Sequence, residues 1–246
     1  MRGPVGLSTV DGPRSSDPLW DGTAPCGGPD SLPHAQRVAR VLAVLEAIGP
    51  PPPARVLDVG CGGGAIALRL AARGFRVDAV DVREDVIGPL QGRVAARVAA
   101  AEQLPFADGA FDVALAIGLL LWLPEPEVAL AELGRVVRPG GLALVTLMNA
   151  GPIDRVLDPA RRVVGRHLPG MWRCTPRQAA ELLGRARLDL VDEATWGFPR
   201  MGPLRRSLEV LAERGVPVVR SSGAQSLLAA RRSAWPAATG FQRRSR

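Results

Sequence analysis

Residues 56–64, VLDVGCGGG, constrain the fold more than any other stretch of this 246-residue chain. Val56, Leu57 and Val59 are typical of a short buried strand, and a cluster of glycines follows them. The run AIALRLAARG then indicates a helix that ends at Gly74. A strand, a glycine turn and a helix in this order let the backbone approach a ligand closely and point helix N–H groups at its polar part. The stretch therefore predicts an α/β fold with a ligand site at the end of its first strand.

The glycines fit two classes of ligand. A Gly-x-Gly-x-x-Ala pattern from Gly60 to Ala65 matches a dinucleotide fingerprint. A Gly-x-Gly-x-Gly pattern preceded by Asp58 matches the turn of enzymes that use S-adenosylmethionine (SAM). A pyrophosphate would be repelled by that carboxylate, whereas the ammonium and sulfonium groups of SAM would be attracted. The next predicted strand ends near Asp81, whose carboxylate can accept both ribose hydroxyls, so the two acids together favour SAM.

Composition argues against several other classes of protein. No apolar run approaches the roughly 20 residues of a transmembrane helix, and the N-terminus has no hydrophobic leader. We therefore expect a cytoplasmic protein without a membrane span. Three distant cysteines and two histidines predict neither a disulfide framework nor a metal site.

The net charge of +7 is concentrated in residues 151–246, which carry 18 arginines against 8 acidic residues. This excess leaves nucleic acid open as a partner. The arginines are scattered in pairs with few aromatic residues between them, and a solvated helix face with a basic tail accounts for them more simply. The sequence therefore favours a small-molecule partner and is silent on the oligomeric state.

Periodicity and turn residues divide the chain into four parts. We expect an irregular or disordered arm over 1–33, a SAM-binding core over 34–150, a lid insertion with the remaining helix and strand elements over 151–232, and a basic tail over 233–246. Helices are predicted over 34–48, from 65 to 73, over 84–91, from 126 to 137 and from 176 to 186, and strands over 56–59, 75–82, 94–100, 111–117, 142–148, 188–198 and 224–232. The predicted lid is a broken amphipathic stretch over 152–168.

Four motifs stand in a characteristic order between residues 54 and 148. They are VLDVGCGGG, the acid Asp81, AEQLPF with FDVALA, and RVVRPGG before a strand. This segment resembles the class I SAM-dependent methyltransferases, especially the branch similar to the ubiquinone and menaquinone biosynthesis C-methyltransferases (methyltransferase type 11). The resemblance implies a Rossmann-like α/β fold, with a seven-stranded sheet, helices on both faces, an antiparallel last strand and a helical lid. SAM would lie across the carboxyl ends of strands one, two and four.

The resemblance also implies a role for each matching residue. Around the methionine and ribose portions of SAM it places Gly60, Cys61, Gly62 and Gly64. Around the charged and adenine groups it places Asp58 at the amino group, Asp81 at the ribose hydroxyls, Val82 on an adenine face, Ala101 and Glu102 at the adenine edge, and Ile117 near the sulfonium.

Two positions depart from the family pattern. Relatives often carry an aspartate where this chain has Ala100, and one or two histidines after strand four, where this chain reads GLLLWL. The apolar stretch suits a hydrophobic acceptor but supplies no general base. His167 is the candidate base, because it is one of two imidazoles and lies in the predicted lid. Trp122, Trp172 and Trp196 are candidates for lining the acceptor pocket, with ordinary packing as the alternative.

Methyl transfer from a sulfonium is an in-line displacement with a good leaving group, so positioning and water exclusion supply much of the acceleration. The sequence predicts a SAM-dependent methyltransferase that moves a methyl group to oxygen or carbon of a small, hydrophobic or aromatic metabolite. A nucleic-acid (RNA) methyltransferase is one alternative, although no Asn-Pro-Pro-aromatic motif follows strand four. A SAM-binding protein that transfers no methyl group is the other.

Overall fold

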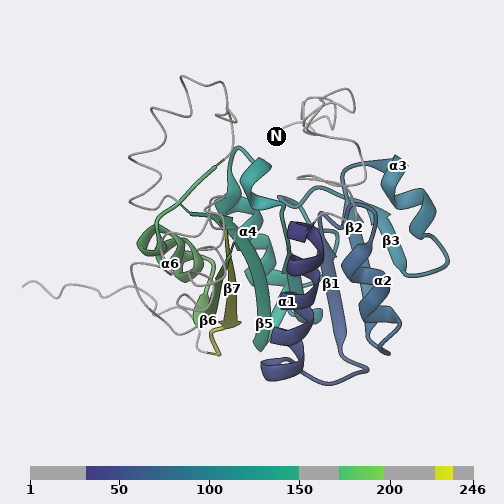
Figure 1. Cartoon of the computed structure of the whole chain (residues 1–246), viewed down its shortest axis with the longest axis horizontal. Helices are drawn as coiled ribbons and strands as arrows, with labels where there is room; N and C mark the ends of the chain where they lie inside the picture. Colours follow the sequence, from purple (N-terminus) through teal and green to yellow (C-terminus); the bar gives the residue numbers. More distant parts are fainter. Residues whose placement is uncertain (1–31, 150–171, 197–224, 235–246) are drawn as a thin grey trace, which may run out of the picture.

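A computed structural model describes residues 32–149, 172–196 and 225–234, and they form one seven-stranded sheet flanked by helices (Figure 1). The strands are β1 (Arg55–Val59), β2 (Arg76–Asp81), β3 (Ala95–Val98), β4 (Phe111–Ala116), β5 (Val137–Met148), β6 (Leu188–Trp196) and β7 (Gln225–Arg232). The helices are α1 (Leu32–Ile48), α2 (Ala65–Ala71), α3 (Glu84–Ile87), α4 (Pro126–Val136) and α6 (Pro176–Arg185), with 3₁₀ turns η1 (Gly88–Leu90) and η2 (Leu120–Trp122).

The strands are arranged in the order β3-β2-β1-β4-β5-β7-β6. The pairs from β3 to β5 are parallel, and β7 runs antiparallel to both of its neighbours. The predicted Rossmann-like fold with an antiparallel last strand is therefore confirmed. The predicted lid over 152–168 lies outside the described residues.

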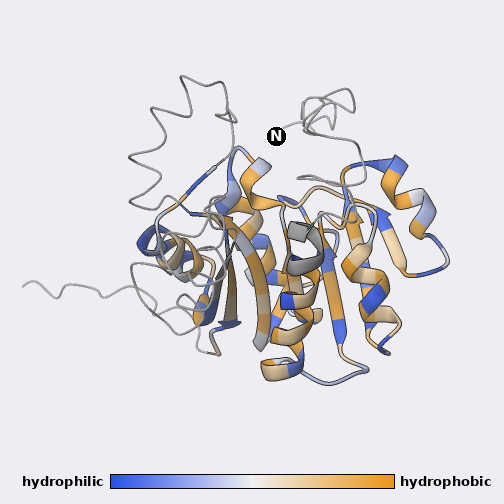
Figure 2. Ribbon diagram, in the orientation of Figure 1, coloured by the Kyte–Doolittle hydropathy of each residue, from blue (hydrophilic) through white to orange (hydrophobic). Residues whose placement is uncertain are grey.

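Two apolar clusters cover the two faces of the sheet, because side chains alternate along each strand. In β4, Ala114 and Ala116 face the layer of α4 and α6, whereas Val113 and Leu115 face the layer of α1 and α2. Figure 2 shows the central strands as mostly hydrophobic, as expected for parallel strands buried on both sides. None of the helices in the described part of the chain is long and apolar enough to cross a membrane.

Helix α1 packs on one face of the sheet. Its apolar residues Val38, Val41 and Leu45 have helical spacing and pack on the sheet, as the sequence predicts. The chain then passes through the loop over 49–54 into the amino end of β1. The first turns of α1 consequently lie near the carboxyl ends of the parallel strands, where open α/β sheets bind ligands.

Two local predictions differ from the structure. The helix expected over 84–91 divides into α3 and the turn η1, since Pro89 has no N–H to continue the α-helical hydrogen bonds. The turn expected at RPGG is instead the irregular start of β5, which follows α4 directly. The pairing of β4 with β5 shifts register here, and Arg138 Nε lies 2.6 Å from Asp112 Oδ1 across the two strands.

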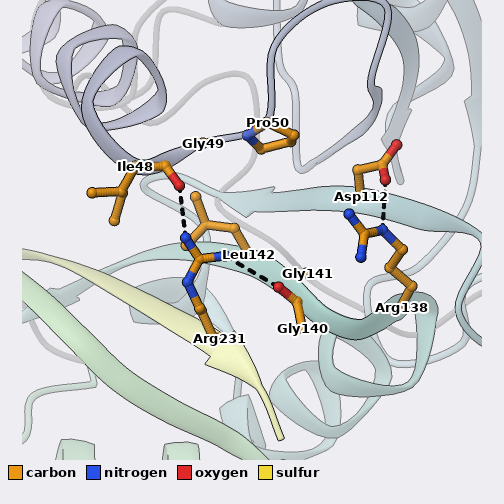
Figure 3. Close-up of a pocket in the computed structure, with 9 residues that line it drawn as sticks. All are labelled: Ile48, Gly49, Pro50, Asp112, Arg138, Gly140, Gly141, Leu142 and Arg231. Atoms are coloured by element: carbon orange, nitrogen blue, oxygen red, sulfur yellow. Dashed lines mark hydrogen bonds and ion pairs between the residues drawn. The ribbon is translucent and has the colours of Figure 1, made fainter. Parts of the chain in front are cut away.

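A hollow of about 190 Å³ opens at the amino ends of the central strands, whereas the glycine turn lies at their carboxyl ends (Figure 3). Ile48, Gly49, Pro50, Asp112, Arg138, Gly140, Gly141, Leu142 and Arg231 line it. Arg231 of β7 donates hydrogen bonds to the Ile48 carbonyl at 2.8 Å and to the Gly140 carbonyl at 3.1 Å. The guanidinium thus ties the last residue of α1 to the start of β5, which is a structural role.

Replacing Arg231 by methionine is expected to lower the free energy of unfolding by about 1 kcal/mol and Tm by about 3 °C. The two carbonyls would lose a charged donor, but water can reach them because the site is exposed. Thermal unfolding would measure the change, with Arg73→Met as the control, since Arg73 is exposed on the surface beyond α2. Equal Tm values for the two variants would show that this tie contributes nothing.

Candidate functional site

The glycine turn between β1 and α2 has a backbone that other residues rarely adopt. Gly60, Gly62 and Gly64 have φ values of 68°, 50° and 73°. The N–H groups of Gly60 and Cys61 donate to the Val80 carbonyl at 2.8 and 3.0 Å, which fastens the turn to β2. Because positive φ favours glycine, the three glycines of the motif stand at the positions where this loop needs them.

The turn is packed on two sides and open on a third. A Cβ on Gly60 would lie 2.8 Å from a methyl of Leu119, and one on Gly64 would lie 2.5 Å from a methyl of Leu90. Built Cβ atoms on Gly62 and Gly63 would meet nothing within 4 Å. The middle of the turn is therefore where a ligand can approach the backbone.

Cys61 lies within this turn as a partly buried thiol. Burial, together with the negative charges of Asp58 and Asp81, raises the pKa of Cys61 well above its ordinary value. A thiol that stays protonated is a poor nucleophile. This agrees with a packing role for Cys61 in the turn.

Asp58 is a buried acid at the carboxyl end of β1, with 2% of its surface exposed. Burial raises its pKa to about 7, the N–H of Ala67 opposes this shift, and the charge of Asp81 adds to it. Its Oδ2 atom is buried and has no hydrogen-bond partner among the residues that the structure describes. An unsatisfied buried carboxylate oxygen is unfavourable on its own, and a cationic ligand would relieve it.

Asp81 ends β2 and already organises the backbone around it. Its Oδ2 accepts from the N–H of Gly62 at 2.9 Å, and its Oδ1 accepts from the N–H of Arg83 at 3.0 Å. Each carboxylate oxygen can accept a second hydrogen bond. The side chain can therefore hold the glycine turn and still accept from a pair of ligand hydroxyls.

The residues expected at the adenine lie around Asp81. Val82 follows it and is 56% exposed, which is high for a valine. The turn containing Ala101 and Glu102 comes just after β3, which is tied to β2 because Ala99 donates to the Asp81 carbonyl at 3.0 Å. The structure therefore brings Val82, Ala101 and Glu102 to the same edge of the sheet as Asp81.

An ion pair holds the loop after this turn, and no motif in the sequence indicates it. Glu132 of α4 accepts from the Leu104 N–H at 2.8 Å, and Arg135 donates to the carbonyls of Leu104 and Phe106. Hydrogen bonds from Arg135 lower the pKa of Glu132, which keeps the pair charged. Acid and arginine three residues apart on a helix are too common to identify such a clamp from sequence.

The end of β4 shows another feature that the sequence analysis missed. Gly118 follows Ile117, has a φ of 78° and donates its N–H to Thr146 Oγ1 at 2.5 Å. The side chain of Arg37 reaches this point from α1 and is buried. The spacing in the sequence could have indicated this position, because Arg37 lies four residues before Val41 and therefore on the apolar side of the helix.

The residues expected at the acceptor are only partly described. Trp122 belongs to η2, and Trp172 donates its backbone N–H to the neighbouring Leu121 carbonyl at 3.0 Å. The backbone of Trp196 ends β6, which is parallel to β5, so it reaches the same edge of the sheet. His167 lies outside the described residues. Three tryptophans from distant segments thus approach one edge.

These features fit SAM better than a dinucleotide. The unsatisfied oxygen of Asp58 suits an ammonium, Asp81 suits ribose hydroxyls, and the open glycine backbone allows close approach. A methyltransferase domain family matches residues 57–145 of the chain. The malonyl-[acyl-carrier protein] O-methyltransferase of Serratia marcescens is 32% identical over 196 residues, which cover 77% of this chain and 76% of the relative.

The chain belongs to the class I SAM-dependent methyltransferases.

Solved structures agree with this assignment at the level of the fold. Magnesium protoporphyrin IX methyltransferase from Synechocystis PCC 6803 with bound SAH has a TM-score of 0.61 at 19% identity, covering 81% of this chain and 84% of that one. The [4+2]-cyclase SpnF has a TM-score of 0.58 at 25% identity, covering 80% and 81%. The cofactor of this methyltransferase is SAM, which supplies an activated methyl group for transfer.

Substituting Asp81 by asparagine is expected to weaken SAM binding by this methyltransferase about 30-fold. Asparagine keeps one acceptor oxygen, so its NH2 group would face the N–H of either Gly62 or Arg83 and could not accept from it. Asparagine also lacks the negative charge that strengthens hydrogen bonds from the ribose hydroxyls. Calorimetric titration with SAM would measure the loss. Asp85→Asn is the matched control, because Asp85 is 67% exposed and pairs with Arg83 on the surface. Similar affinities for both variants would contradict the assignment of Asp81.

Proposed function

We propose that this methyltransferase transfers the methyl group of SAM to an oxygen, in a small acceptor that has an apolar body and a carboxylate. The main support is the likeness to a malonyl-[acyl-carrier protein] O-methyltransferase over three quarters of that relative. The carboxylate is the free oxygen nucleophile of a malonyl thioester. A carbon or phenol acceptor, as the sequence also allows, is the alternative within this class.

The chemistry of a carboxylate acceptor suits the residues at the end of β4. A carboxylate is already ionised at neutral pH, so no base has to remove a proton. The described stretch from Gly118 to Leu123 is apolar and contains no titratable side chain. Such a wall supports an acceptor that needs positioning and exclusion of water more than proton transfer.

The roles that we propose for the cofactor residues are those that the family resemblance implies, and the geometry of the two acids supports them. Asp58 holds the ammonium of SAM, and Asp81 holds the ribose hydroxyls while it anchors the glycine turn. Val82, Ala101 and Glu102 border the adenine, and Ile117 lies near the sulfonium. Gly60, Cys61, Gly62 and Gly64 form the backbone against which the methionine portion rests.

The acceptor would enter between η2 and the end of β5. Trp172 and Cys174 donate their backbone N–H groups to the carbonyls of Leu121 and Met148, both at 3.0 Å. The described residues on either side of 150–171 therefore lie at this edge, which supports the proposal that the predicted lid over 152–168 covers the acceptor. The tryptophans at 122, 172 and 196 would contact the apolar body of the acceptor.

The division into arm, core, lid region and tail, and the cytoplasmic location, stay predictions.

The acceptor is tested by supplying methyl-labelled SAM with a malonyl thioester, with its terminal amide, or with a catechol that has an apolar tail. We expect a labelled methyl ester from the malonyl thioester and no product from the amide. The rate at saturating SAM should change little between pH 6 and pH 9, because the carboxylate stays ionised. Labelled catechol instead would move the assignment to a hydroxyl acceptor.

His167→Ala separates the two acceptor classes. Turnover of a carboxylate should be unchanged, whereas a phenol that depends on a base should lose roughly 100-fold or more. SAM binding without any labelled product would support the SAM-binding alternative, a possibility made concrete by the likeness to a cyclase. Label in polynucleotides would support the nucleic-acid alternative, which the similarity to a malonyl-[acyl-carrier protein] O-methyltransferase does not favour.

A further inference from the structure

The loop over 99–110 joins β3 to β4 and carries Ala101 and Glu102, the residues expected at the adenine edge. Ala101 is 4% exposed and Glu102 is partly buried. Buried N–H and carbonyl groups need partners, which a helix or a strand would supply through its regular hydrogen bonds. Several partners of this loop come from other elements of the fold, and these partners determine where its backbone lies.

The two residues at the adenine edge lie between two anchors. On one side, the Ala99 N–H donates to the Asp81 carbonyl of β2 at 3.0 Å. On the other side, the Leu104 N–H donates to Glu132 Oε2 at 2.8 Å, and the Leu104 carbonyl accepts from Arg135 Nη2 at 3.0 Å. This second anchor comes two residues after the adenine edge, which places it within about 7 Å along the chain.

Arg135 also holds the second half of the loop. Its Nη1 atom donates to the Phe106 carbonyl at 2.7 Å and to Asp108 Oδ1 at 2.9 Å, and its own carbonyl accepts from the Gly109 N–H at 2.9 Å. Glu132 Oε1 accepts from Arg135 Nε at 2.7 Å and so orients the guanidinium. Hydrogen bonds from a charged, planar donor are stronger and more directional than those between neutral groups.

The helix that carries this pair is itself held in place. Leu133 and Val136 of α4 are fully buried in the apolar cluster on one face of the sheet. Arg232 of β7 donates to the Arg135 carbonyl at 2.8 Å and also to the Val137 carbonyl. The loop is therefore attached to a rigid part of the fold and not to another loop.

We propose that Glu132 and Arg135 position the adenine edge of the SAM site, acting through the loop backbone and not by touching the cofactor. A loop that is fixed before binding loses little backbone freedom when the base arrives. Ordering the backbone of one or two residues on binding would lower affinity by about 10- to 100-fold. The inference rests on the proposed place of the adenine beside Ala101 and Glu102, and it does not depend on the acceptor.

The test compares calorimetric affinities for S-adenosylhomocysteine (SAH) and for S-ribosylhomocysteine, in which a hydroxyl replaces the adenine. The wild type should prefer SAH by about 100-fold. Arg135→Met should bind SAH about 30-fold more weakly, while its affinity for S-ribosylhomocysteine changes by less than about twofold. Methylthioadenosine keeps the adenine and lacks the amino acid, so it should weaken by the same factor as SAH.

Two milder variants and a matched control accompany this change. Glu132→Gln keeps an acceptor for the Leu104 N–H but loses its charge, and Arg135→Lys keeps the charge but loses the planar fork. Both should lose part of the preference for SAH. The control is Arg177→Met, because Arg177 and Glu181 form a similar pair at 3.0 Å on α6 with side chains that are 90% and 53% exposed. This control should bind both ligands as the wild type does.

Binding of S-ribosylhomocysteine with unchanged affinity also shows that a variant is folded. A purely structural role would lower Tm and change the affinities for both ligands alike. The proposal is overturned by that result, by unchanged affinities in Arg135→Met, or by a wild type that does not prefer SAH. A failure to methylate the malonyl thioester would refute the proposed acceptor and leave these binding comparisons valid.

Discussion

Asp58→Asn is expected to weaken SAM binding about 100-fold at pH 7.5 and to leave the ligand-free fold at least as stable as the wild type. The variant removes the carboxylate that we propose faces the ammonium of SAM, while its amide oxygen can still accept from the Ala67 N–H. Calorimetry would measure the affinity and thermal unfolding the stability. The affinity for SAM should fall while the stability of the ligand-free protein does not, because that protein has a buried carboxylate with an unsatisfied oxygen.

The sign of the stability change follows from the pKa of Asp58. Its value of about 7 in the folded protein exceeds the value of about 4 in an unfolded chain. The folded state therefore binds the extra proton, and the stabilisation is complete below about pH 4 and is lost as the pH rises through 7. The pKa difference corresponds to roughly 4 kcal/mol in the free energy of unfolding, lost as Asp58 ionises in the folded protein. An asparagine does not ionise, so the variant would not suffer this loss at pH 7.5.

The same carboxyl makes SAM binding depend on pH. The ammonium of SAM favours the ionised form, so the affinity of the wild type should fall about tenfold per pH unit below pH 7. The α-amino group of SAM loses its own proton near pH 8, which limits the useful range to pH 5.5–7.5. Asp58→Asn should show a flat profile there. A wild-type profile that is also flat, or an unchanged affinity in the variant, would refute the role of Asp58.

Gly134→Ala is expected to destabilise the fold by about 3 kcal/mol and to lower Tm by about 9 °C. Gly134 lies in α4 where the end of α6 crosses it, and an added Cβ would stand 2.0 Å from the Ala186 carbonyl oxygen. That oxygen belongs to the backbone, so relief requires the two helices to separate. Both helices also contribute to the apolar cluster on one face of the sheet, which would loosen with them.

Gly184→Ala is the matched control for this effect. Gly184 lies in α6, and a Cβ there would meet nothing within 4 Å. Alanine is the better helix former, so this variant should gain about 0.5–1 kcal/mol. Chemical denaturation of both variants would decide the matter. A stable Gly134→Ala protein would mean that α4 and α6 do not pack as closely as described.

The regular elements could be predicted because their signals are local. Apolar spacing and the stop at Gly49 define α1, and the Thr175 capping box with Pro176 defines the start of α6. Strand β4 and the second half of β5 appear as apolar runs without alternation, since both of their faces are covered. Predictions failed where a partner outside the segment intervenes, as at the start of β5, where Arg138 pairs with Asp112 of another strand.

The fold class, the glycine turn and the two acids Asp58 and Asp81 can be predicted from the amino-acid sequence, because each depends on residue type and short spacing along the chain. The tertiary structure alone decided that Asp58 is buried with a raised pKa, that Glu132 and Arg135 hold a distant loop, and that Arg37 reaches Gly118. These features join segments from 9 to 81 residues apart. Distances and burial across such separations arise from packing, and no local pattern in the sequence encodes them.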